Sequence, residues 1–254
     1  MTHPKTKGHI ALVGAGPGAR DLLTLRALER IRAADVLLYD RLVDPEIMEL
    51  ARPGAERIYV GKDVGACKWP QGRIDRLIVA KARLGLRVVR LKSGDPSIFG
   101  RACEEIAAAR AAGIEIEIVP GITAASAAAA SIGRPLTERG ETDTFVITTG
   151  TCKPGDAAPD RARLAHPGTS MAFYMAVEKA GQVQDDLLAG GAPGACPVDI
   201  VASASTPNER HASTTLGDLA ACIAREGLKG PAILFVRYPK SLAAQIESDG
   251  RSAA

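Results

Sequence analysis

Glycines and carboxylates at the ends of predicted strands are the residues of this sequence whose types and spacing could do chemistry. Gly14, Gly16 and Ala19 in "HIALVGAGPGARDLLTL" satisfy a G-x-G-x-x-G/A pattern after an apolar strand, as in loops whose backbone approaches a pyrophosphate. Asp40 closes "DVLLYD", about where a dinucleotide-binding domain places a carboxylate for a ribose hydroxyl. These residues predict a nucleotide-type ligand at the first loop.

Two features argue against an extended dinucleotide. Pro17 lies inside the first loop, where it removes one of the N–H groups that would meet a pyrophosphate. Two further loops, "RLKSGDPSIFGR" (90–101) and "VPGITAAS" (119–126), follow the fourth and fifth predicted strands. Because ligands of open α/β sheets bind beyond the carboxyl ends of the strands, the three loops predict one deep pocket for a folded, compact cofactor.

Strand-length apolar runs alternate with helix-length stretches, which predicts an α/β protein built largely on parallel sheet. The first series has strands near 9–14, 36–39, 57–60, 87–91 and 115–119 and helices near 21–33, 45–51, 72–84, 100–112 and 122–131. The second has strands near 143–149, 170–174, 197–203 and 231–237 and helices near 160–165, 178–189 and 216–226. The turn-rich stretch "GRPLTERGE" separates the two series. We therefore expect an N-terminal α/β domain over 1–138 and a C-terminal α/β domain over 139–254, with a frayed tail.

Composition limits the function classes of the 254-residue chain. The net charge is only +3 without a basic stripe, and aromatic residues make up 4%, so we expect no nucleic-acid partner. No apolar run reaches the roughly 20 residues of a membrane span, and no apolar leader segment is recognised, so we expect a cytoplasmic protein without membrane contact. The five scattered cysteines and four histidines form no metal-binding pattern, so we expect mostly buried, reduced thiols and no metal site.

Longer strings carry a resemblance to a known family. They are "VGAGPGARDLLTLRALERIRAADVLLYDRLV" (13–43), "VGKDVGACKWPQGRID" (60–75), "RVVRLKSGDPSIFGRACEEI" (87–106), "VPGITAAS" (119–126) and "FYM" (173–175). In sequence and order they resemble the uroporphyrinogen-III C-methyltransferases, most strongly up to about residue 135. The resemblance implies a tetrapyrrole methylase-like α/β fold, with two αβα domains and the active site in the cleft between them.

The same resemblance implies a reaction and its partners. S-adenosyl-L-methionine is the implied methyl donor, S-adenosyl-L-homocysteine is its product, and the implied assembly is a homodimer. Methyl groups are added at C2 and C7 of uroporphyrinogen III, which gives precorrin-2 by way of precorrin-1 for siroheme, cobalamin or haem d1 synthesis. Such a transfer needs sulfur, methyl and carbon in line, an advantage worth up to roughly 7–11 kcal/mol, and a base improves the carbon nucleophile.

The resemblance also implies roles for individual residues. Asp40 matches the proposed proton acceptor and Lys62 the proposed proton donor. The predicted cofactor-binding residues are Pro17, Ser93, Gly94, Asp95, Ile98, Thr123, Ala124, Met175, Ala204 and Ala232. A substrate with eight carboxylates calls for arginines, so Arg41 and Arg101 are predicted to bind it together with Met175, and Arg134 and Arg139 are further candidates.

The sequence departs from the family pattern at "KSGDPS", at "GRACEE" and at Ala204. These departures bear on the substrate more than on the cofactor, because related methylases share the loops and differ in the tetrapyrrole they accept. Three alternatives remain: another precorrin methyltransferase of cobalamin synthesis, an NAD-dependent oxidoreductase, and a binding protein without turnover on the same fold.

Overall fold

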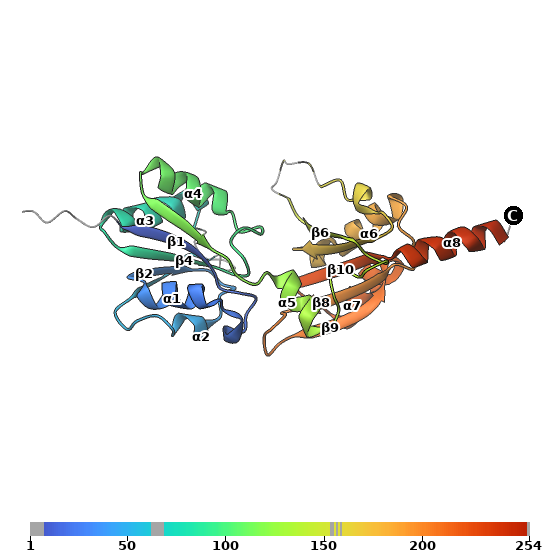
Figure 1. Cartoon of the computed structure of the whole chain (residues 1–254), viewed down its shortest axis with the longest axis horizontal. Coiled ribbons are helices and arrows are strands. Elements are labelled where there is room, and N and C mark those ends of the chain that lie inside the picture. Colours follow the sequence, from blue (N-terminus) through green and yellow to red (C-terminus); the bar gives the residue numbers. More distant parts are fainter. Residues whose placement is uncertain (1–7, 62–68, 153–154, 156, 158, 253–254) are drawn as a thin grey trace, which may run out of the picture. The chain divides into compact units, whose positions relative to one another are not determined.

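The computed structural model describes residues 8–61, 69–152, 155, 157 and 159–252 (Figure 1). The chain divides into two compact units, 1–124 and 125–254. The sequence places the boundary at 138/139, further along the chain. Ala129, Arg134 and Leu136 line a pocket together with residues of the second sheet, which explains why the segment before 138 belongs with the second unit.

The first unit is a five-stranded sheet between two layers of helices. Its strands β1 (His9–Gly14), β2 (Val36–Tyr39), β3 (Glu56–Tyr59), β4 (Arg87–Lys92) and β5 (Glu115–Val119) are all parallel, in the order β3-β2-β4-β1-β5. The helices α1 (Leu25–Ala33) and α2 (Pro45–Met48) cover one face, and α3 (Gln71–Arg83) and α4 (Ala102–Ala111) cover the other (Figure 1). Because the strands are parallel, their carboxyl ends share one edge of the sheet.

Alternation along the strands places residues on the two faces of this sheet. Val89 and Leu91 of β4 join the core beneath α1 and α2, whereas Val88 joins the core beneath α3 and α4. Helix ends follow capping chemistry: the Thr24 hydroxyl accepts a hydrogen bond from the Ala27 N–H at the start of α1. The first sheet confirms the predicted parallel arrangement.

The second unit contains a mixed sheet. Its strands β6 (Thr144–Thr149), β7 (Thr169–Tyr174), β8 (Pro197–Ala202), β9 (Arg210–Thr215) and β10 (Ala232–Tyr238) follow the order β6-β7-β10-β8-β9. β6 and β7 are parallel, but β10 runs antiparallel to both of its neighbours and β9 runs antiparallel to β8. The prediction of largely parallel sheet is therefore wrong for this unit, because the last strand is inserted between β7 and β8 in the reverse direction.

Helices and short turns complete the chain. The remaining helices are α5 (Ala124–Ser131), α6 (Ala180–Ala189), α7 (Leu219–Glu226) and α8 (Lys240–Ser252), and short 3-10 turns are η1 (Arg20–Leu22), η2 (Ala162–Leu164), η3 (Val177–Lys179) and η4 (Leu216–Asp218). The predicted helix near 160–165 is only the turn η2, and α8 extends into the tail that the sequence predicts to be frayed. Within the described part of the chain, no helix is long and apolar enough to cross a membrane.

Candidate functional site

The three glycine-containing loops of the first unit meet at the carboxyl edge of its sheet. Gly16 N donates to Gly94 O at 3.2 Å, and Gly94 N donates to Gly16 O at 2.6 Å. A Cβ atom on Gly14 would lie 2.6 Å from the Cα of Gly121 and 2.7 Å from Gly94 O. Gly14, Gly16, Gly94 and Gly121, hereafter the glycine cluster, are thus in direct backbone contact, which side chains at Gly14 and Gly121 would prevent.

Asp95 joins the second loop to the third. Its Oδ1 accepts a hydrogen bond from Ser97 N at 2.7 Å and another from the Ser97 hydroxyl, while its Oδ2 accepts from Gly121 N at 2.9 Å. Ile98 N closes the turn by donating to the Asp95 carbonyl at 3.1 Å. These contacts assign Asp95 to holding the loops together, and its predicted contact with a cofactor stays a prediction.

Gly94 lies next to the backbone of the third loop. Gly94 has a left-handed φ of +68°, and a Cβ atom there would lie 3.7 Å from both the Thr123 Cα and the Ala124 N, at ordinary van der Waals distance. Ser93 is not among the non-glycine residues with positive φ, so its side chain carries no left-handed strain. Pro17 follows Gly16 in the first loop and is half-buried. The structure therefore places Gly94 next to Thr123 and Ala124, and their predicted contacts with a cofactor stay predictions.

Asp40 lies at the end of β2 beside buried charges. Its Oδ2 accepts a hydrogen bond from Arg90 Nη2 at 3.3 Å, and its Oδ1 accepts from Leu42 N at 3.2 Å. Arg90 Nε donates to Glu105 Oε1 at 3.3 Å, and Lys92 Nζ lies 2.8 Å from Glu105 Oε2. Glu105 has no exposed surface, and Arg90 and Lys92 are only 6% and 5% exposed. We call Arg90, Lys92 and Glu105 the buried charge cluster.

Sequence reasoning missed the buried charge cluster, although β4 carries a signal for it. The strand reads "RVVRLK", and alternation puts Val88, Arg90 and Lys92 on the same face of a central strand. Charged residues at alternate positions of such a strand must be buried, and buried charges require partners. Burial, and then the neighbouring Arg90 charge, lower the pKa of Lys92. Gln71 Nε2 extends the network by donating to Glu105 Oε1 at 3.2 Å.

The predicted proton donor and substrate arginines have different outcomes. Lys62 lies outside the described residues, so its proposed role stays a prediction. Arg41 is exposed next to Asp40. Arg101 has a left-handed φ of 55° and forms hydrogen bonds of 2.7 and 2.6 Å to the two Glu104 carboxylate oxygens, which raise the pKa of Arg101. The substrate-binding roles of Arg41 and Arg101 stay predictions.

Three other predicted residues lie at one edge of the second sheet. Met175 follows β7, Ala204 follows β8, and Ala232 begins β10 between these two strands. Met175 has a left-handed φ of 52° and is 54% exposed, and Thr151 Oγ1 donates to its Sδ at 3.9 Å. Each sheet therefore collects its own predicted cofactor residues at one edge.

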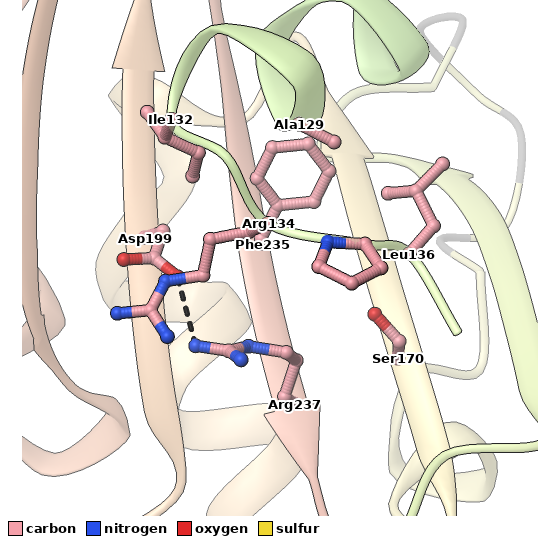
Figure 2. Close-up of a pocket in the computed structure, with 9 residues that line it drawn as sticks. Ala129, Ile132, Arg134, Leu136, Ser170, Asp199, Phe235 and Arg237 are labelled. Atoms are coloured by element: carbon pink, nitrogen blue, oxygen red, sulfur yellow. Dashed lines mark hydrogen bonds and ion pairs between the residues drawn. The ribbon is translucent and has the colours of Figure 1, made fainter. Parts of the chain in front are cut away.

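A separate pocket of the second unit contains Arg134 (Figure 2). It is lined by Ala129, Ile132, Arg134, Pro135, Leu136, Ser170, Asp199, Phe235 and Arg237. Asp199 is 4% exposed; it accepts a hydrogen bond from Arg237 Nη2 at 2.9 Å and lies 3.4 Å from Arg134 Nε. Arg134, a further substrate candidate from the sequence, is thus engaged in an ion pair inside its own unit.

The fold and the site define a class of ligand-binding α/β protein. Glycine loops are in backbone contact at the carboxyl edge of a parallel sheet, and a carboxylate follows a neighbouring strand of the same sheet. Among the residues that the structure describes, no three histidine, cysteine or carboxylate side chains are grouped to hold a metal ion.

Comparison with known proteins identifies the family. Residues 9–220 match the family described as Tetrapyrrole (Corrin/Porphyrin) Methylases. The chain belongs to this family. Siroheme synthases of Stutzerimonas stutzeri and Azotobacter vinelandii are 45% and 46% identical to it over 233 residues, which cover 92% of this chain and 50% of each relative. The chain therefore spans about half the length of the curated relatives it matches.

Solved structures support the same fold. A uroporphyrin-III C-methyl transferase of Thermus thermophilus, complexed with S-adenyl homocysteine, is 38% identical with a TM-score of 0.76, and the match covers 91% of this chain and 97% of that chain. A cobalt precorrin-4 methyltransferase is 27% identical with a TM-score of 0.83, and the match covers 94% and 98% of the two chains. The predicted tetrapyrrole methylase-like α/β fold is confirmed.

Proposed function

We propose that the chain is a uroporphyrinogen-III C-methyltransferase, which transfers methyl groups from S-adenosyl-L-methionine to C2 and C7 of uroporphyrinogen III and forms precorrin-2 by way of precorrin-1. The observation that carries the proposal is the contact of three glycine loops at one sheet edge, close to which Asp40 follows the neighbouring strand β2. The 38% identity to the Thermus thermophilus transferase supports this substrate.

The residues at the glycine cluster fit an S-adenosyl cofactor. Because Gly94 has no side chain, the position that a Cβ atom would occupy beside the backbone of Thr123 and Ala124 is available to a ligand. The residues that would hold the cofactor are Pro17, Ser93, Gly94, Asp95, Ile98, Thr123 and Ala124 of the first unit, with Met175, Ala204 and Ala232 of the second. When bound, the cofactor supplies an electrophilic methyl group.

Asp40 has contacts suited to a proton acceptor. Its side chain is 29% exposed, so a substrate can reach the carboxylate, while Arg90 on the buried side holds it by a hydrogen bond of 3.3 Å. In the proposed reaction the Asp40 carboxylate removes a proton from the porphyrinogen, which makes the pyrrole carbon a better nucleophile. Arg41 and Arg101 would bind substrate carboxylates, and Lys62 would return a proton.

A second candidate function is methylation of a later precorrin. The structure of the cobalt precorrin-4 methyltransferase matches this chain with a TM-score of 0.83, above the 0.76 of the uroporphyrin-III enzyme, although at lower sequence identity. The departures at Ser93 and Ala204 bear on this choice of substrate. We also propose, from the family resemblance, that the chain acts in the cytoplasm as a homodimer.

Methyl counting tests the proposed function. The chain is incubated with uroporphyrinogen III and methyl-labelled S-adenosyl-L-methionine, and the product mass is measured. We expect two methyl groups per macrocycle, a rate at least tenfold lower for Asp40→Asn, and an unchanged rate for Asp44→Asn, because Asn caps helix α2 as well as Asp does. Methylation of a later precorrin but not of uroporphyrinogen III would favour the second candidate, and transfer to neither would refute both.

A further inference from the structure

The buried charge cluster connects two parts of the proposed site. Arg90 and Lys92 share one face of β4, and Leu38 of β2 pairs with Arg90 in the sheet register. Asp40, two residues beyond Leu38, therefore comes within reach of the Arg90 guanidinium, which lies 3.3 Å from its Oδ2. The chain uses the pleat of two adjacent parallel strands to bring a buried cation to the proposed proton acceptor.

Lys92 makes the second connection. Its Nζ donates to the Gly100 carbonyl at 2.5 Å and also lies 2.8 Å from Glu105 Oε2. Gly100 stands between Phe99 and Arg101, both of which have left-handed φ values, and a Cβ atom on Gly100 would lie 3.0 Å from the Pro96 carbonyl carbon. Non-glycine residues with a left-handed backbone are strained, and the surrounding contacts must stabilise that conformation. The hydrogen bond from Lys92 to the Gly100 carbonyl is one such contact.

Glu105 stands at the centre of both connections. One fully buried carboxylate faces Arg90 and Gln71 at Oε1 and Lys92 at Oε2. Two cations meet one central anion, and the Asp40 carboxylate provides the second negative charge. The groups that face Asp40 and this cluster are Arg90 and Lys92 of β4, Glu105 of α4 and, beyond Gln71, Asp75 of α3.

We propose that Glu105 and Arg90 are positioning residues of the site. Glu105 fixes the Arg90 guanidinium, which holds the Asp40 carboxylate in place, and it fixes Lys92 against the turn that presents Phe99 and Arg101. This inference rests on the proposed function of Asp40 as proton acceptor. Both residues act through Asp40 and the turn, without contact to substrate.

Replacement of Arg90 separates positioning from folding. In Arg90→Gln we expect a methyl-transfer kcat at least tenfold lower and an S-adenosylhomocysteine affinity within twofold of the wild type, because the Asp40 carboxylate loses the hydrogen bond that holds it. Arg90→Lys should restore part of kcat, since a lysine keeps the charge without the planar fork. The control is Glu56→Gln, which removes the exposed ion pair of Glu56 and Lys81 (2.6 Å) in the same unit.

A double-mutant cycle supplies a readout that does not depend on turnover. Urea unfolding of wild type, Asp40→Asn, Arg90→Gln and the double variant should show coupling, with a smaller effect of Asp40→Asn in the Arg90→Gln background. Additive effects, or an Arg90→Gln variant with wild-type kcat, would overturn the inference. An inactive wild type would refute the proposed function alone, and the cycle would then decide the positioning of Asp40. Glu105→Gln is measured in the same assays. If Glu105→Gln does not fold, the Arg90 variants alone test the inference.

Discussion

Gly94→Ala tests whether the glycine cluster binds the cofactor, and the chain offers a matched control. Gly94 and Gly113 have nearly the same left-handed backbone, with φ of +68° and +66°. An alanine Cβ costs about 1–2 kcal/mol in this conformation, so the two variants should lose similar stability. For a chain of this size, about 2–4 °C per kcal/mol gives an expected loss of about 2–8 °C in Tm for each.

Ligand binding should separate the two variants. The Cβ atom on Gly113 meets nothing within 4 Å, whereas the Cβ on Gly94 would lie 3.7 Å from Ala124 N and Thr123 Cα, in the space assigned to the cofactor. We expect Gly94→Ala to bind S-adenosylhomocysteine at least tenfold more weakly, about 1.4 kcal/mol, and Gly113→Ala to bind it as the wild type does. Thermal denaturation and titration calorimetry measure the two effects. Wild-type affinity in Gly94→Ala, or equal losses of affinity in both variants, would refute the reasoning.

Three further predictions concern charge. Glu105→Gln should lower the free energy of unfolding in urea by about 3–5 kcal/mol, because two buried cations lose their anion. The triple variant Glu105→Leu, Arg90→Met and Lys92→Met should lose less stability, because it leaves no buried charge unpaired in the cluster. A triple variant as unstable as Glu105→Gln would contradict this. The hydrogen bond from Arg87 lowers the pKa of Asp35 from 3.8 to about 2, so its stabilisation is present above pH 3.8 and is lost as pH falls toward 2. Asp35→Asn should therefore cost about 1–2 kcal/mol at pH 7, after allowance for solvent screening, and almost nothing at pH 2, as measured by acid unfolding. The pKa of Lys92 is lowered from 10.5, so the unfolded chain binds more protons between the folded-state value and 10.5; wild-type stability relative to Lys92→Met should rise with pH across that window, and a fall would contradict it.

The first unit was largely predictable from sequence because its signals are local. The strands β1 and β2 are apolar, largely buried runs that lead into a glycine or aspartate turn, and runs buried on both faces favour parallel sheet. The second unit was less predictable. β9 has mostly exposed or half-buried residues, "RHASTT", and pairs only with β8 among the described strands, so no apolar run marks it. The reversed insertion of β10 depends on contacts far apart in sequence.

The candidate site also has parts that the sequence predicts and parts that it does not. Gly94 and Asp95 carry a turn signature that sequence can identify, whereas the packing of Gly121 against Gly14 and Gly94 depends on three loops meeting in space. Glu105 was missed because charged residues are mostly exposed. The sequence of helix α4 does not indicate that the Glu105 carboxylate faces two cations of β4.

Titration of the wild-type chain with S-adenosylhomocysteine and, separately, with NAD tests the central claim most directly. If the glycine cluster binds a folded S-adenosyl cofactor, calorimetry will show saturable binding of S-adenosylhomocysteine near one molecule per chain and no heat from NAD. Binding of NAD without binding of S-adenosylhomocysteine would contradict the account and restore the dinucleotide interpretation of the first loop.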